Sequence, residues 1–104
     1  GVLRPETIAA SREVSSAGEP DRIMGHPVRW SYGFQLGGPI GLARPTGSRA
    51  HPRTFGHNGS SICNVWADPV RDLVVAYLTN TADERRRALR HLSDVSDAIL
   101  VACG

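Results

Sequence analysis

Lysine is absent from this chain of 104 residues, and all twelve of its basic residues are arginine. Without lysine the chain has no Schiff-base amine, no phosphate-loop lysine and no Ser-x-x-Lys nucleophile pair. The formal net charge is only +2, which is too small to favour nucleic acid as a partner. A basic nucleic-acid module is the alternative interpretation of the run Arg85-Arg86-Arg87, which we interpret as the solvated face of a helix.

Cysteine is also scarce, because the chain contains only two. Cys63 and Cys103 fall on different expected elements, so we expect both to be reduced thiols. A catalytic Cys63 would need a nearby base to stabilise its thiolate, and the strand-like run around it favours an inert, packed thiol. The four histidines lack the spacing of a zinc site, and Asp68 and Asp72 flank an expected turn. We therefore expect no metal and no cofactor.

Long apolar runs are missing as well. No stretch approaches the roughly 18 apolar residues of a membrane span, so we expect no membrane-spanning segment. The first residues, 1–5, lack the charged start and apolar run of a signal peptide, which predicts a cytoplasmic location by default. The sequence does not begin with Met, and we expect it to start within a longer protein. Its length and its 40% hydrophobic content suit one small globular domain.

A helix is predicted at the start of the chain. Pro5 fits the first position of a helix, and Glu6 suits the positive end of the helix dipole. Arg4 would occupy the cap position, where it is a poor capping residue. We expect this helix to fade near Val14.

Strands are predicted in the middle of the chain by runs of aromatic and β-branched residues. A long connection rich in glycine and proline, 37–53, separates the first strand from the others, and loops of this length are often functional or mobile. The last strand is nearly all apolar, so both of its faces should be covered. The predicted strands are 28–36, 54–57, 62–67 and 73–78, with a hairpin turn at 68–72.

A second helix is predicted to end near Cys103. Thr81 and Glu84 have the spacing of a capping box. Apolar residues then follow at helical spacing, and they should pack across the sheet: Ala88, Leu89, Leu92, Val95, Ile99 and Leu100. The sequence therefore predicts an α+β fold, with an antiparallel sheet of three or four strands and a helix at each end of the chain.

The tetrapeptide Gly56-His57-Asn58-Gly59 is the most informative chemical feature of the sequence. Small residues at the end of a strand let a substrate carbonyl approach backbone amides. The amide of Ser60 would then point at a developing oxyanion. His57 could polarise a substrate, hold a carboxylate or help proton transfer. The alternative is a plain turn that carries a surface histidine.

The order of the elements around this tetrapeptide resembles the closing segment of class C β-lactamase-like serine hydrolases, which include esterases and penicillin-binding relatives. Further segments that carry the resemblance are Leu3-Arg4-Pro5-Glu6-Thr7, Trp30-Ser31-Tyr32-Gly33-Phe34-Gln35-Leu36, Trp66-Ala67-Asp68-Pro69 and Thr79-Asn80. The resemblance extends over nearly the whole chain. It implies that residues 1–104 form the C-terminal portion of a β-lactamase-related domain, with the region that bears the nucleophile absent.

The resemblance also implies roles for individual residues. His57 takes the place of the lysine in the family's Lys-Thr-Gly motif, and Asn58 and Gly59 take the places of its threonine and glycine. Ser60 takes the place of the residue whose amide completes the oxyanion hole. The expected catalytic residues are therefore His57 and Ser60, and the expected substrate-binding residues are Asn58 and Gly59.

Two further motifs of the family are missing from this chain: Ser-x-x-Lys, which needs a lysine, and Tyr-x-Asn. The stretch Tyr77-Leu78-Thr79-Asn80 has one residue too many to replace the second motif. The implied function is hydrolysis of a small ester or amide, either an ester or a β-lactam, by a serine acyl-enzyme route. This chain would supply one wall of the cleft and be inactive alone, so whether it is an enzyme stays open. The alternative is a non-catalytic module that binds a protein partner, or a second copy of itself, through an open sheet edge.

Overall fold

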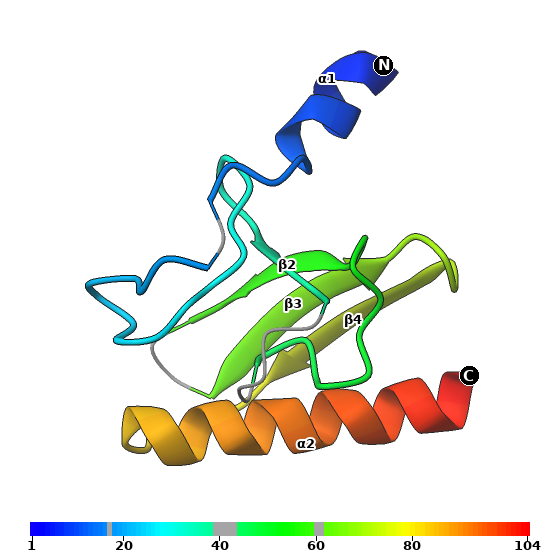
Figure 1. Cartoon of the computed structure of the whole chain (residues 1–104). Coiled ribbons are helices and arrows are strands. Elements are labelled where there is room, and N and C mark those ends of the chain that lie inside the picture. The colour runs from blue at the N-terminus through cyan, green and yellow to red at the C-terminus, as the bar shows by residue number, and fades with distance from the viewer. Residues whose placement is uncertain (17, 39–43, 60–61) are drawn as a thin grey trace.

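The computed structural model describes residues 1–16, 18–38, 44–59 and 62–104, and these form two helices and a four-stranded sheet. The strands pair antiparallel in the order β1-β2-β3-β4, and α2 lies along one face of the sheet (Figure 1). This arrangement confirms the predicted α+β fold. The elements are α1 (Pro5–Ser11), β1 (Gln35–Leu36), β2 (Phe55–Asn58), β3 (Cys63–Asp68), β4 (Leu73–Leu78) and α2 (Arg85–Cys103).

The core lies between the sheet and α2, and Trp66 is its largest fully buried side chain, with 1% of its surface exposed. Trp66 lies opposite Gly56 on β2 and Val75 on β4. A Cβ atom at Gly56 would collide with the carbonyl oxygen of Val65 and with Trp66, so only glycine lets β2 approach β3 this closely. The indole nitrogen of Trp66 donates to the Oγ of Ser96 on α2 at 3.0 Å, which joins the sheet to the helix.

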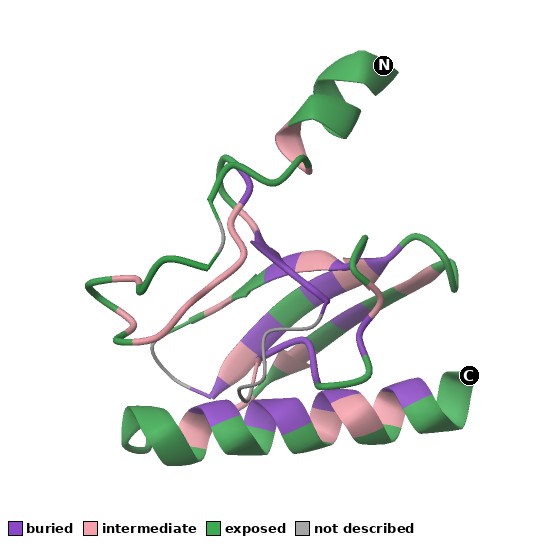
Figure 2. Ribbon diagram, in the orientation of Figure 1, coloured by how far each residue is buried: buried purple, intermediate pink, exposed green. Residues whose placement is uncertain are grey.

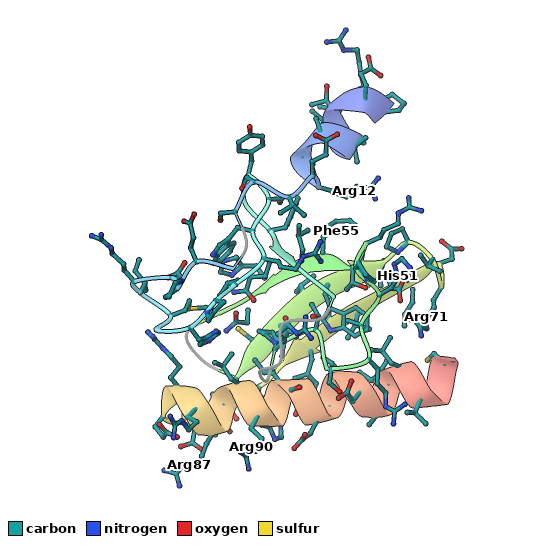
Figure 3. The ribbon with its side chains drawn as sticks, in the orientation of Figure 1. Arg12, His51, Phe55, Arg71, Arg87 and Arg90 are labelled. Atoms are coloured by element: carbon teal, nitrogen blue, oxygen red, sulfur yellow. The ribbon has the colours of Figure 1, made fainter. Side chains whose placement is uncertain are left out.

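The apolar stripe predicted for α2 is confirmed: Leu89, Leu92 and Leu100 are buried against the rest of the chain. Figure 2 shows these buried positions on the side of α2 that faces the sheet. Arg87 and Arg90 point away from the sheet (Figure 3). Two serines, at positions 93 and 96, are also buried in the stripe, which hydrophobic spacing did not predict.

The start of α2 differs from the prediction. The helix begins at Arg85, and the side chain of Glu84 caps it by accepting from the amide of Arg87 at 2.9 Å. The carbonyl of Thr81 instead accepts from the amide of Ile62 at 3.0 Å, which ties Thr81 to the start of β3. The prediction of a capping box between Thr81 and Glu84 was therefore wrong, because this backbone bond holds Thr81 outside the helix.

The prediction of one strand over 28–36 was largely wrong, because this segment folds back on itself as a tight hairpin. The amide of Ser31 donates to the carbonyl of Phe34 at 3.0 Å, and the amide of Leu36 donates to the carbonyl of Arg29 at 2.8 Å. Only Gln35–Leu36 joins the sheet, as β1. The aromatic residues that favoured one long strand therefore lie on both arms of a short hairpin.

The connection over 37–53 is partly buried and is not simply a surface loop. Residues 39–43 lie outside the described residues, but Thr46 is buried and the carbonyl of Pro45 accepts from the Nδ2 of Asn64 on β3 at 2.6 Å. The hydroxyl of Ser96 donates to the same carbonyl at 2.6 Å. Residues 44–50 thus help to fill the space between the sheet and α2.

Asp97 on α2 holds the same connection from the helix side. Its carboxylate accepts from the hydroxyl of Ser48 at 2.6 Å and from the amide of Arg49 at 2.9 Å. Burial raises the pKa of Asp97, but these hydrogen bonds outweigh burial, and the pKa lies below its usual value. Gly47 adopts a φ of +88°, and a Cβ atom there would lie 2.5 Å from the carboxylate. Glycine is therefore needed at this turn.

The second face of the sheet is open. Side chains that alternate with the core residues emerge on it, and Val65, Val74 and Leu78 are 49%, 74% and 74% exposed. Strand 73–78 is therefore covered on one face only among the described residues, and its apolar sequence still expects cover on the other face. α1 has no buried residue and extends away from the sheet (Figure 1). Its end touches the sheet through Arg12, whose guanidinium lies 5.2 Å from the ring centre of Phe55 (Figure 3).

We expect the 104-residue chain to self-associate through this open face. Each large apolar side chain left in water forgoes about 1.5 to 3 kcal/mol of burial, and β4 has a partner on one side only among the described strands. Sedimentation velocity should show concentration-dependent association that Val74→Glu weakens. Val70→Glu, in the turn between β3 and β4, is the matched control. A monomeric wild-type chain at every concentration would contradict this prediction.

Asp68 should support the fold in a pH-dependent way. Its buried carboxylate accepts from the amides of Val70 and Arg71, at 2.9 and 3.2 Å, and pairs with the guanidinium of Arg71 at 2.7 Å. Burial raises the pKa of Asp68, but these bonds lower it further than burial raises it. Because the folded pKa lies below the unfolded one, this stabilisation is present above the unfolded pKa and is lost as pH falls through the folded pKa.

Asp68→Asn should therefore lower the free energy of unfolding at pH 7 by about 1 to 3 kcal/mol. The variant should also lose part of the decline in stability that the wild type shows below about pH 4. Urea unfolding followed by circular dichroism measures both effects. Asp94→Asn, at an exposed position of α2, is the matched control. Equal losses in the two variants would show that the contacts of Asp68 are not stabilising.

Candidate functional site

His57 lies at the end of β2 and belongs to the open face of the sheet. It pairs in register with Val65, and its side chain is exposed. Its Nδ1 lies 2.6 Å from the carbonyl oxygen of Asn58. A carbonyl can only accept, so we assign the proton of the neutral ring to Nδ1. This tautomer leaves Nε2 with a lone pair that can accept a proton.

Trp30, on the first arm of the hairpin of residues 29–36, forms a wall beside this imidazole. The two ring centres are 5.7 Å apart, and the ring planes are inclined by 38°. The indole nitrogen of Trp30 donates to a carboxylate oxygen of Asp21 at 2.9 Å. The amides of Met24 and Ile23 also donate to Asp21 and, with Trp30, hold its pKa below the usual value. An anionic Asp21 thus fixes the ring of Trp30 that lies against His57.

Asn58 points to the opposite side from His57, as neighbouring residues of a strand do. Its Oδ1 accepts from the Nε2 of Gln35 at 2.9 Å. Gln35 is only 4% exposed, so the orientation of the Asn58 amide is fixed by a buried partner. The side chains of His57 and Asn58 therefore do not converge on one point, and an approaching ligand would meet them from different sides.

Gly59 leaves the sheet directly after Asn58. Its amide donates to the carbonyl of Cys63 at 3.1 Å, and a Cβ atom at this position would lie 2.5 Å from the thiol sulfur of Cys63. Glycine is thus required by local packing, whatever its chemical role. Ser60, the expected oxyanion donor, lies outside the described residues. Both cysteines are free thiols, as predicted.

Two hollows meet at His57. One, of about 310 Å³, lies between the end of β2 and the start of α2, and Asn58 and Gly59 also line it. The other, of about 290 Å³, lies on the open face of the sheet and includes Phe55 and Val65. His57 is therefore placed where a bound molecule could reach it from the open face or along the strand end.

Sequence reasoning missed two residues that position the site. Gln35 lay inside a predicted strand and was given no role, although a glutamine in an aromatic run is an unusual choice for a buried position. Asp21 lay in an apparent loop, and its bond to Trp30 joins residues nine positions apart. Hydrophobic periodicity carries no information on such contacts, so only the fold reveals them.

Other kinds of site find no support in the part of the chain that the structure describes. Within residues 1–16, 18–38, 44–59 and 62–104, no group of three or more His, Cys, Asp or Glu side chains could hold a metal ion. Neither described helix is long and apolar enough to cross a membrane.

Comparisons with known proteins agree with the fold. The family model described as Beta-lactamase matches residues 1–98. The structure of a β-lactamase from Mycobacterium bovis superposes with a TM-score of 0.78 and 29% identity, over 99% of this chain and 39% of that one. EstA from Arthrobacter nitroguajacolicus Rue61a superposes with a TM-score of 0.63 and 25% identity, over 99% of this chain and 27% of that one.

No curated protein matches the chain at a significant level. This chain spans well under half the length of the two similar structures, so it corresponds to part of their fold. The family model nevertheless matches nearly all of it, including α1, the whole sheet and most of α2. On the strength of that match, the chain belongs to the β-lactamase family.

Proposed function

We propose that this chain forms one wall of the active-site cleft of a serine hydrolase that cleaves a small ester or amide. The observation that carries the proposal is the placement of His57 at the end of β2, on the open face, with Nδ1 bonded to a carbonyl and Nε2 free to take a proton. Membership of the β-lactamase family and similarity to EstA give this placement its context.

His57 acts in this proposal on the proton that the reaction must move. In a serine acyl-enzyme route, a hydroxyl attacks the acyl carbon, its proton passes to a base, and the leaving group takes up a proton when it departs. His57 Nε2 would hold or relay that proton beside the reacting centre. Trp30 and Asp21 are positioning residues here, because they fix the imidazole without reaching the substrate.

Ser60 provides its backbone amide in this proposal, and the amide stabilises the oxyanion that forms when the acyl carbon becomes tetrahedral. One such donor contributes about 2.7 to 4 kcal/mol in known acyl-transfer enzymes. Gly59 keeps the approach to that amide free of a side chain, and Asn58 borders the substrate path along the strand end. These roles are those that the resemblance to the family's Lys-Thr-Gly motif implies for the residues at the matching positions.

The nucleophile and its lysine partner would come from the part of the fold that this chain does not contain. The similar β-lactamase is more than twice as long as the matched segment, which is 39% of its length. The open sheet face, with Val65, Val74 and Leu78 exposed, is the surface on which such a part could pack.

The same exposed face also favours a second candidate function, a module that binds a protein partner without catalysis. Both readings place a polypeptide on this face, but only the first needs the chemistry of His57. A substitution at His57 that leaves assembly intact therefore separates them.

We expect no hydrolysis by the 104-residue chain alone. A nucleophile and its base act as a unit, and a chain without lysine lacks the family's pair. An activated ester and a chromogenic cephalosporin are the substrates for this assay. Turnover above buffer that persists through repeated chromatography, and that His57→Ala abolishes, would show that the chain carries a nucleophile of its own.

The role of His57 is best tested in a chimera. Residues 1–104 would replace the matching segment of the M. bovis β-lactamase, and ester hydrolysis by the chimera would be compared with that of its His57→Ala variant. Loss of proton transfer should lower kcat by about 10²-fold or more, with little change in thermal stability because the side chain is exposed.

His91→Ala is the matched control for this chimera, because His91 is an exposed histidine on α2 whose Nε2 lies 3.0 Å from the Tyr77 hydroxyl. It should leave kcat unchanged. If His57→Ala keeps full kcat, or if it only lowers the melting temperature, His57 is an ordinary surface residue of the strand end and the proposed catalytic role is wrong.

A further inference from the structure

A small cavity lies behind the hairpin of residues 29–36, on the side away from His57. It is lined by residues from four separate stretches of the chain, among them His26, Gln35, Arg44, Thr46 and, on α2, Leu89. Its interior offers about 20 Å³ to the centre of a water-sized molecule, which is room for one such particle. The cavity borders the larger of the two hollows at His57, with which it shares Met24 and Leu89, but His57 does not line it.

Polar atoms of the cavity-lining residues lack hydrogen-bond partners. The Nε and Nη1 of Arg44, the Oγ1 of Thr46 and the Nε2 of His26 are shielded from water, and none has a partner among the described residues. Thr46 as a whole is only 2% exposed. Buried polar atoms in native proteins are nearly always paired, so such a group of donors implies a bound acceptor. A guanidinium has only donors, and a hydroxyl can also donate.

The charge around the cavity is positive. Arg29 also lines it, and its guanidinium donates to the carbonyls of Gly37 and Pro52. Neither Arg29 nor Arg44 has a carboxylate within ion-pair distance in the described ranges. Burial, and then the like charge of Arg29, lower the pKa of Arg44, and Asp97 offsets them only in part. Arg44 is half-buried, and the shielded side of its guanidinium is costly to bury unless an acceptor, best an anion, accompanies it.

We propose that this cavity binds one small monatomic anion, chloride or bromide, on the guanidinium of Arg44 and the hydroxyl of Thr46. A single water would also satisfy two donors, but it would leave the charge of Arg44 uncompensated. His26 donates through Nδ1 to the carbonyl of Pro27, so its Nε2 adds a donor only when the ring is an imidazolium. Arg44 and Thr46 are therefore the principal ligands.

The cavity's size sets the selectivity of the site. Chloride and bromide are only moderately larger than the water-sized particle for which the interior has room, whereas sulfate, with four oxygens around its centre, is much larger, so we expect the site to favour the halides. Gln35 lines the cavity and also donates to Asn58. The anion therefore lies behind a residue that orients the His-Asn-Gly triplet, residues 57–59. This inference does not depend on the proposed hydrolase function.

The NMR line width of chloride in solutions of the 104-residue chain tests the proposal, because a bound halide broadens the resonance. We expect a saturable excess width that bromide displaces and sulfate at equal ionic strength does not. Arg44→Met should weaken chloride binding at least about tenfold, since it removes a charged donor, and Thr46→Val about two- to tenfold. Arg90→Met, on the solvent side of α2, should bind chloride as the wild type does.

Far-UV circular dichroism of each variant shows whether it is folded, and the nearly isosteric Thr46→Val carries the test if Arg44→Met is not. The proposal is overturned by any of three results: no saturable broadening, which would mean a water alone; equal displacement by sulfate, which would mean loose surface association; or unchanged broadening in the folded variants of Arg44 and Thr46.

Discussion

The indole of Trp66 is the constraint on which the rest of the structure depends. Its ring fills the space between the sheet and α2, and its nitrogen donates to the hydroxyl of Ser96. That hydroxyl in turn donates to the carbonyl of Pro45. Sheet, helix and connecting segment therefore meet at one buried point. Gly56 gives this ring its room, because any larger residue would push β2 away from β3. The end of β2, and with it the His-Asn-Gly triplet, is held at a fixed place relative to the core.

The hairpin of residues 29–36 holds the side chains of His57 and Asn58, one from each side. Strand alternation sends His57 to the open face and Asn58 to the other, and the hairpin supplies a partner for each: Trp30 beside the imidazole and Gln35 on the amide. A segment more than twenty residues earlier in the chain thus orients the candidate site. The exposed apolar face next to His57 gives a physical reason for expecting a further polypeptide surface on that side.

Much of the fold could be predicted from residue patterns, and the failures share a cause. The strands at 54–57, 62–67 and 73–78 and the apolar stripe of the last helix follow from local periodicity, and each is found within a residue or so of its expected place. The hairpin at 29–36, the buried turn around Pro45 and the true cap at Glu84 depend on hydrogen bonds between distant residues or on competing backbone bonds. The positions of His57, Asn58 and Gly59 followed from the motif, but their partners Trp30 and Gln35 did not.

Complementation tests most directly the claim that this chain is one wall of a hydrolase cleft. The M. bovis β-lactamase, expressed without the segment that superposes on this chain, would be mixed with residues 1–104, and ester hydrolysis and complex formation would be measured together. The account predicts that the two pieces associate and that hydrolysis appears only in the mixture. A stable complex without hydrolysis, or the absence of any complex, would contradict it.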